Sequence, residues 1–153
     1  MSRARRLQPL QKLAVEREQV AARALAQARA TTSMREAKLE QLQGYLREYQ
    51  QGQGIAMNVA DPRAWQNRQA FLLRLQAAVR QQEGLVTQAR NDEERAAAQW
   101  RERRQEVASL GCVVDRLLAE EAVVEQRQER RQQDEFAARV RWHGPCSTEG
   151  EEH

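Results

Sequence analysis

One hydrophobic stripe constrains this chain more than any other feature, because its spacing alternates between three and four residues from Trp65 to Val124 without a break. The positions of this seam are Trp65, Arg68, Leu72, Leu75, Val79, Gln82, Val86, Ala89, Glu93, Ala96, Trp100, Arg103, Val107, Leu110, Val114, Leu117, Glu121 and Val124. A repeat of about 3.5 residues over such a length is typical of a coiled-coil helix, because it holds one stripe against a partner helix. A helix pair of this kind leaves little room for an enclosed catalytic pocket, so function is expected on its surface.

The composition agrees with long helices rather than with a thick globular core. Ala, Gln, Glu, Arg and Leu dominate the 153 residues, and the mean hydropathy is −0.88. The 25 basic and 22 acidic residues are interspersed, which is typical of solvated helix faces with ion pairs four residues apart. Nucleic-acid-binding proteins usually concentrate positive charge on one face, so no nucleic acid is expected as a partner. The pI near 9.3 still permits an acidic partner.

The sequence favours neither membrane insertion nor secretion. No apolar run approaches the length of about 18 residues that a transmembrane helix requires, and no apolar signal core follows the N-terminal arginines. Cys112 and Cys146 are too few and too far apart to indicate a disulfide framework, which fits a reducing cytoplasm.

A first helix is expected from about Leu7 to Gln50. Pro9 is compatible with it, because a proline in the first turn has no helical hydrogen bond to lose. Apolar residues recur along this segment at helical spacing, and many are alanines that permit close approach of a second helix. They are Leu7, Leu10, Ala14, Ala21, Ala24, Ala28, Leu39, Leu42, Tyr45 and Tyr49.

A second, longer helix is expected over about 62–141, after a connection at 51–61. Asp61 and Pro62 provide an N-cap followed by a proline at the first helical position, which is a specific start signal. A connection this short is expected to turn the chain back on itself. The predicted fold is therefore all-α, a long antiparallel two-helix coiled coil (an α-hairpin) that forms one domain over 1–142.

Part of the second helix is expected to lack a partner within the chain, because the two helices differ in length. If Gln50 lies opposite Arg63, then Leu7 lies opposite a residue near Glu106, and the seam beyond about Val107 overhangs the first helix. An apolar stripe left in water is costly, so we expect this overhang to be an interaction surface. Its apolar members and flanking arginines are Val114, Leu117, Leu118, Val124, Arg116, Arg127, Arg130 and Arg131.

Aromatic residues gather where the helices meet at the connection. The members of this tip cluster are Leu42, Tyr45, Tyr49, Phe71, Leu75 and Ala78. Phe71 is one position off the seam, so part of the cluster is expected to face outward. The cluster is either a small core at the hairpin end or a partner site that uses Tyr and Phe as anchors. Trp65 and Trp100 lie on the seam and are expected to pack, whereas Trp142 is a candidate contact residue.

Catalytic machinery is not evident in the sequence. His143 and His153 have no ligand cluster around them, and both fall in the acidic segment 143–153, which is predicted to be a disordered tail. No glycine-rich phosphate loop is present, and carboxylates on helix surfaces have ordinary chemistry. We therefore expect no enzymatic activity, no metal and no cofactor.

Several segments resemble the flagellar export protein FliJ family. They are Leu42–Tyr49 with the glycine-containing connection after it, Phe71–Val79, Trp100–Arg104, Asp134–Ala137 and Arg6–Leu10. Their order and spacing extend the likeness to about residue 141. The chain departs from the family at Gln82, where some members have a histidine on the tip surface, and at Lys38, where a glutamine can occur.

The resemblance implies a non-catalytic coiled-coil component of the flagellar type III export apparatus. It implies three partners: a hexameric export ATPase, the cytoplasmic domain of the membrane export gate, and empty substrate-specific export chaperones. By analogy, the overhang would bind the centre of the ATPase ring and the tip cluster would bind the gate. The free chain is expected to be a cytoplasmic monomer that associates peripherally with the inner face of the cell membrane at the flagellar base.

Other functions fit some of the same features. The equivalent stalk of a virulence-type injectisome shares all of them, and genomic neighbourhood would separate the two. A nucleic-acid-associated coiled coil requires a salt-sensitive affinity for DNA, and the even scatter of acidic residues argues against it. A further alternative is that the overhanging stripe serves self-association.

Overall fold

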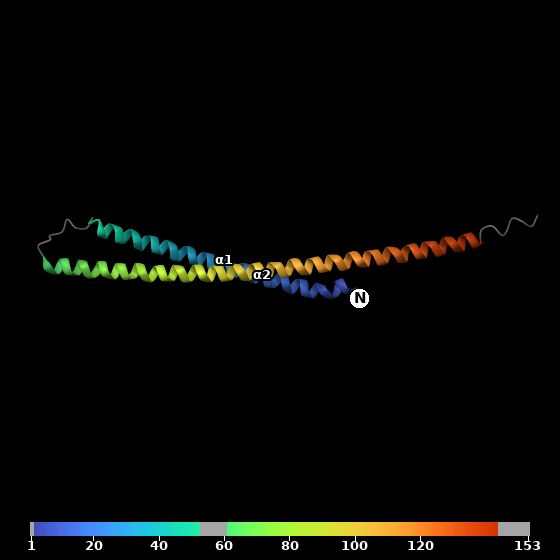
Figure 1. Ribbon diagram of the computed structural model, residues 1–153, viewed down its shortest axis with the longest axis horizontal. Coiled ribbons are helices and arrows are strands. Elements are labelled where there is room, and N and C mark those ends of the chain that lie inside the picture. Colours follow the sequence, from blue (N-terminus) through green and yellow to red (C-terminus); the bar gives the residue numbers. More distant parts are fainter. Residues whose placement is uncertain (1, 53–60, 144–153) are drawn as a thin grey trace, which may run out of the picture. The chain divides into compact units, whose positions relative to one another are not determined.

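The computed structural model describes residues 2–52 and 61–143, and these residues form two helices. Helix α1 is Arg3–Gln50 and helix α2 is Pro62–His143, drawn from blue to cyan and from green to red in Figure 1. No strand occurs among the described residues. The prediction of an all-α fold with a longer second helix is confirmed. Most of the predicted connection (residues 53–60) and of the predicted disordered tail (residues 144–153) lies outside the described residues.

The ends of both helices follow from their capping residues. The Asp61 carboxylate accepts a hydrogen bond from the Arg63 N–H at 3.1 Å, so the predicted N-cap of α2 is confirmed. Helix α1 begins earlier than expected, because the Ser2 hydroxyl oxygen accepts a hydrogen bond from the Arg5 N–H at 3.2 Å. Gly52 follows the end of α1 with a φ of 77°, the left-handed conformation that often terminates a helix.

The early start of α1 changes the position of Pro9. This proline was expected in the first turn but lies inside the helix. Proline has no N–H, so the carbonyl group four residues before it loses its helical hydrogen bond. The α1 helix nevertheless continues through Pro9 to Gln50.

The chain divides into two compact units. Of the described residues, 15–52 and 61–105 form one unit, here called the hairpin unit. The other unit, here called the terminal unit, consists of residues 2–14 and 106–143. Each unit combines a part of α1 with a part of α2.

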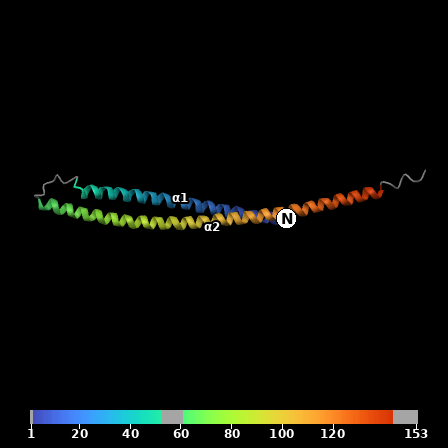
Figure 2. The same ribbon diagram turned by 45° about the horizontal axis from the view of Figure 1, so that its top comes forward.

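In the hairpin unit the two helices run antiparallel. Near the end of α1, the Tyr49 ring lies 4.7 Å from the Phe71 ring, between centroids. Earlier in α1, the Glu18 carboxylate accepts a hydrogen bond from the indole N–H of Trp100 at 2.9 Å. The cyan part of α1 and the green part of α2 lie side by side in Figures 1 and 2. The predicted antiparallel hairpin is confirmed.

The predicted seam of α2 is the buried face of that helix. Every seam position from Arg68 to Glu121 is buried or half-buried, and the most deeply buried is Val86, which is 2% exposed. The two terminal seam residues, Trp65 and Val124, are exposed. A 3.5-residue repeat therefore predicts which face of α2 packs over most of its length.

The buried face of α1 differs from its predicted apolar stripe. A continuous series of its buried and half-buried residues also alternates at three and four: Ala4, Leu7, Gln11, Ala14, Glu18, Ala21, Leu25, Ala28, Thr32, Arg35, Leu39, Leu42 and Leu46. Beside this series, Ala22, Thr31, Gln43 and Gly44 are half-buried too. The prediction was wrong for Leu10, Ala24, Tyr45 and Tyr49, which are exposed. The reason is that polar residues share this face with alanines, so apolarity alone does not distinguish the buried side of α1.

The predicted register of the two helices was wrong by about one heptad. Pairing Gln50 with Arg63 would place Thr32 opposite residue 81, but the Thr32 hydroxyl donates a hydrogen bond to the Ala89 carbonyl oxygen at 3.2 Å. A shift of seven residues returns every seam position to the same face, so the repeat itself cannot determine the register. Specific contacts do so, including the hydrogen bond between Trp100 and Glu18.

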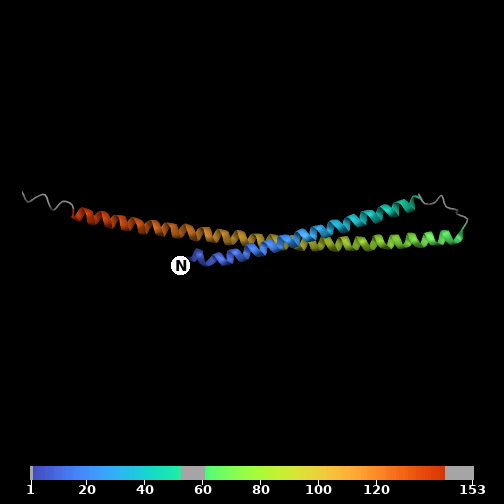
Figure 3. The same cartoon turned by 180° about the vertical axis from the view of Figure 1, so that it is seen from behind.

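In the terminal unit, α1 covers more of α2 than expected. The Ala4 N–H donates a hydrogen bond to a carboxylate oxygen of Glu121 at 3.5 Å, and Val114 is only 7% exposed. The prediction that the seam overhangs from about Val107 is therefore wrong. All residues over 122–142 are exposed, and in Figure 3 no other described helix lies beside the red end of α2. We call residues 122–142 the exposed α2 end.

The two seam tryptophans have different environments. Trp100 is half-buried, donates its hydrogen bond to Glu18, and lies 5.2 Å from the Arg104 guanidinium carbon, measured to the ring centroid. The expected packing role is confirmed for Trp100. Trp65 is 56% exposed, so the same expectation was wrong there.

This difference predicts unequal effects of the same substitution. Trp100→Phe is expected to lower the free energy of unfolding by about 1–2 kcal/mol, because it removes a hydrogen bond to a partly buried carboxylate. Trp65→Phe is the matched control and is expected to cost less than about 0.5 kcal/mol. Urea denaturation followed by circular dichroism measures both. Equal losses would show that the bond to Glu18 contributes nothing.

Candidate interaction surfaces

The buried polar side chains of the hairpin unit are hydrogen-bonded within that unit. Thr32 and Gln82 are its buried polar side chains. The Thr32 hydroxyl lies 3.2 Å from the carbonyl oxygen of Ala89, and the Gln82 amide donates to the carbonyl oxygen of Arg35 at 3.0 Å. Among the described residues, no buried side-chain nitrogen or oxygen lacks a hydrogen-bond partner. The buried polar groups of the seam are therefore all hydrogen-bonded, and Gln82 is buried as its seam position predicts.

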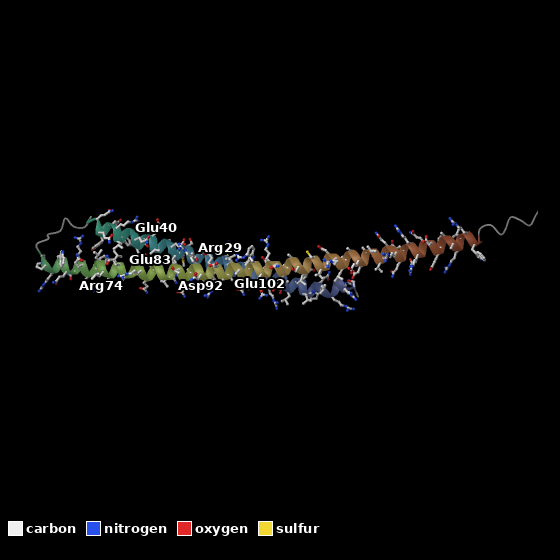
Figure 4. All side chains as sticks on the ribbon, viewed as in Figure 1. Arg29, Glu40, Arg74, Glu83, Asp92 and Glu102 are labelled. Carbon is white, nitrogen blue, oxygen red and sulfur yellow. The ribbon has the colours of Figure 1, made fainter. Side chains whose placement is uncertain are left out.

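Charged side chains line the outside of the hairpin unit. Figure 4 labels several that are exposed on the two helices. Arg90 pairs with Glu36 at 3.0 Å, and Arg29 pairs with Glu93 at 3.7 Å. Exposed pairs of this kind contribute little stability, but charge pairs flanking a seam disfavour wrong registers. If α1 were shifted by one heptad toward the register expected from the sequence, Arg90 would lie opposite Arg29 instead of Glu36. The attraction between Arg90 and Glu36 would then be replaced by a repulsion between two arginines.

The tip cluster combines an exposed aromatic part with a packed aliphatic part. Tyr45 and Tyr49 are 48% and 38% exposed, and Phe71 is also exposed. Gln41 donates a hydrogen bond to the Tyr45 hydroxyl oxygen at 3.0 Å, which holds that ring on the surface. Leu75, in contrast, is buried. We call Tyr45, Tyr49 and Phe71 the aromatic patch.

The remaining members of the tip cluster are less exposed than the aromatic patch. Leu42 and Ala78 are half-buried, like much of the seam around them. With the buried Leu75 they are the less accessible members of the cluster, and the three rings are its accessible surface. The reading as a small core therefore fits the aliphatic members, and a partner site at the exposed aromatic members stays a prediction.

The residues predicted to form the overhang also divide into two groups. Val114 is buried and Leu117 is half-buried, so both pack in the terminal unit. The others are exposed: Leu118, Val124, Arg116, Arg127, Arg130 and Arg131. Four further large apolar residues of the exposed α2 end are exposed as well: Val123, Phe136, Val140 and Trp142. Sequence analysis named Trp142 as a contact candidate but gave no role to Val140.

A groove in the terminal unit was missed by sequence analysis. Its lining residues come from the start of α1 and from α2: Ser2, Arg3, Leu117, Glu120, Glu121, Val124, Glu125 and Gln128. Its volume is about 450 Å³. The expected helix began at Leu7, so Ser2 and Arg3 were not placed beside α2. The N-capping serine was the signal that could have found it.

The described residues offer no candidate metal site and no candidate membrane span. Within residues 2–52 and 61–143, no group of three or more His, Cys, Asp or Glu side chains is arranged to hold a metal ion. Neither of the described helices contains a stretch apolar enough to cross a membrane. The exposed aromatic patch, the exposed α2 end and the groove are thus the features to compare with known proteins.

Comparisons with known proteins agree over nearly the full length of the chain. A family model described as "Flagellar FliJ protein" matches residues 2–145. A relative with the same description, from Salmonella typhi, is 31% identical over 145 residues. That alignment covers 91% of this chain and 95% of the relative. The match to the family model includes both described helices and all three surface features.

Proposed function

This chain belongs to the FliJ family of flagellar proteins, and from that premise we propose that it couples an export ATPase to the export gate. Membership of the family makes it a component of the flagellar export apparatus. The flagellar description of the family model also favours this apparatus over a virulence injectisome. In the proposal the chain has no chemistry of its own and acts through surfaces on its two helices.

The observation that carries the proposal is the exposed α2 end. It is helical and exposed over 122–142, and only the start of α1 lies near its first residues, at the groove. We assign it to the centre of the hexameric ATPase ring, where a single helix can be surrounded by protein. Leu118 and Val124 supply exposed apolar contact, and Val114 and Leu117 support the helix from its packed side. The direct test is ATP hydrolysis by the purified export ATPase, which this chain is expected to accelerate.

Arginines give the same surface a charged component. Arg116, Arg127, Arg130 and Arg131 are all exposed. In the proposal they meet acidic residues of the ring, and such charges mostly tune the rate of encounter and the register of the complex. Charge reversal at Arg127 or Arg130 is therefore expected to reduce stimulation of the ATPase only partially, and the size of the loss should depend on the salt concentration.

The aromatic patch is assigned to the cytoplasmic domain of the export gate. Exposed Tyr and Phe side chains supply large contact areas with few rotatable bonds, which is why they recur as anchors in protein interfaces. The buried Leu75 and half-buried Leu42 and Ala78 would hold the rings in position rather than touch the gate. The proposal also includes capture of empty export chaperones and a location at the inner face of the membrane.

Loss of the two tyrosines is expected to weaken gate binding without unfolding the chain. Tyr45→Ala together with Tyr49→Ala should raise the dissociation constant for the purified gate domain at least about tenfold. The melting temperature should change little, because both rings are largely exposed. The matched control is Val20→Ala with Met34→Ala, which removes two exposed apolar side chains of α1 outside the patch. A large drop in melting temperature, with binding reduced only in proportion, would make the tyrosines structural residues.

A further inference from the structure

The groove of the terminal unit combines apolar and acidic surface. Leu117 and Val124 supply apolar side chains to its lining, and Glu120, Glu121 and Glu125 supply carboxylates. Arg3 is the basic side chain among the lining residues. A groove of about 450 Å³ is large enough for one or two side chains of a partner protein. Its charge favours a partner that is basic as well as apolar.

The acidic residues of this region form a row that the helix itself does not compensate. Glu121, Glu125 and Glu129 are spaced four residues apart along α2, so their side chains are neighbours on one face. No basic residue lies three or four positions from any of them. Like charges at this spacing destabilise a helix, and an external positive charge would relieve the repulsion.

The neighbouring arginines are in a different situation. Arg130 and Arg131 each have an acidic residue four positions further along α2, at Asp134 and Glu135. Opposite charges at that spacing can pair within the helix. Arg127 has no acidic residue at that spacing, so it adds a positive charge beside the row. The lining of the groove itself holds three carboxylates and one arginine, so its charge is negative although the chain as a whole carries a net charge of +3.

We propose that the groove receives a segment of the export ATPase that carries an Arg or Lys next to an apolar side chain. The apolar side chain would pack on Leu117 and Val124, and the cation would pair with the carboxylates around Glu125. Carboxylates bind Arg through charge-assisted and often bidentate hydrogen bonds, which fix orientation as well as affinity. This inference rests on the proposed function.

The ring contact would then involve both positive and negative side chains of α2. The proposed function places the arginines of the exposed α2 end against acidic ring residues. The groove places basic ring residues at the acidic row, which interleaves with the arginines because Glu129 lies between Arg127 and Arg130. The ring would thus present both basic and acidic residues to this stretch of α2, and their pattern would fix how far the helix enters.

The test reverses the charge of the row without disturbing the start of α1. Glu121 accepts the hydrogen bond from the Ala4 N–H, so it is left in place. The variant is Glu125→Arg with Glu129→Arg. Its control is Glu83→Arg with Glu102→Arg, which changes the net charge equally at two exposed glutamates labelled in Figure 4. Affinity for the purified hexameric export ATPase is measured by biolayer interferometry at low and physiological salt.

Charge reversal at the row is expected to weaken binding to the ATPase at least about tenfold, with the control within about twofold of wild type. The isosteric variant, Glu125→Gln with Glu129→Gln, should lose about threefold. Circular dichroism checks that helicity is retained in each. Unchanged or tighter binding by the Arg variant would overturn the inference while leaving the proposed function standing. If the wild-type chain itself fails to bind the ATPase, the proposed function fails and this inference with it.

Discussion

A chain that ends at Val124 is expected to fold as before and to lose its stimulation of the export ATPase. The truncation keeps every residue that packs between α1 and α2, including Val114 and the Glu121 that bonds to Ala4. It removes 125–153, which contains Arg127 and most of the exposed α2 end. The expected loss of stimulation is nearly complete, because the proposed ring contact loses most of its length.

Two measurements separate this outcome from simple unfolding. Thermal melting by circular dichroism should give nearly the same midpoint for the truncated and the full chain. A chain that ends at Trp142 is the matched control and should stimulate ATP hydrolysis fully, because it retains residues 122–142. Full stimulation by the chain ending at Val124 would place the ATPase contact elsewhere on the molecule.

The largest effect on stability is expected from Val86→Gly. Val86 is the most deeply buried seam residue, at 2% exposed, and the substitution removes three packed carbon atoms while adding backbone freedom. Together these losses should lower the free energy of unfolding by about 3 kcal/mol. Val79→Gly should act in the same direction, because Val79 is buried on the same face two turns earlier.

Val123→Gly provides the matched comparison. Val123 is exposed in α2, so the substitution has the same helix-propensity cost without the loss of packing. Its expected effect on the free energy of unfolding is below about 1 kcal/mol. Urea denaturation of both variants isolates the contribution of the seam. Similar losses at the two positions would contradict the assignment of Val86 to a packed core.

The packed face of α2 could be predicted from the sequence, but its alignment with α1 could not. Hydrophobic periodicity reports which side of a helix is buried, and the seam from Arg68 to Glu121 agrees with it. Register depends on individual pairs, such as Trp100 with Glu18 and Arg90 with Glu36. Such pairs cannot be chosen from periodicity, because a slip of one heptad preserves the pattern.

The difference between the expected and the observed register explains why some residues of the predicted overhang are packed rather than exposed. Val114 and Leu117 were expected on an unpaired part of α2. The start of α1 lies as far along α2 as Glu121, however, and so covers both residues. The start of α1 was also expected too late, at Leu7, because the N-cap at Ser2 precedes the apolar pattern. The aromatic patch was easier to predict, because its residues are identified by their type and by their position beside the connection, neither of which depends on the register.

The measurement that tests coupling most directly is retention of the ATPase on an immobilised gate domain. The account predicts that purified export ATPase is retained only when this chain is also present. The tyrosine double variant should lose both proteins from the gate, and the chain ending at Val124 should stay bound without the ATPase. Retention of the ATPase to the same extent without the chain, or binding of the two partners in competition, would contradict the account.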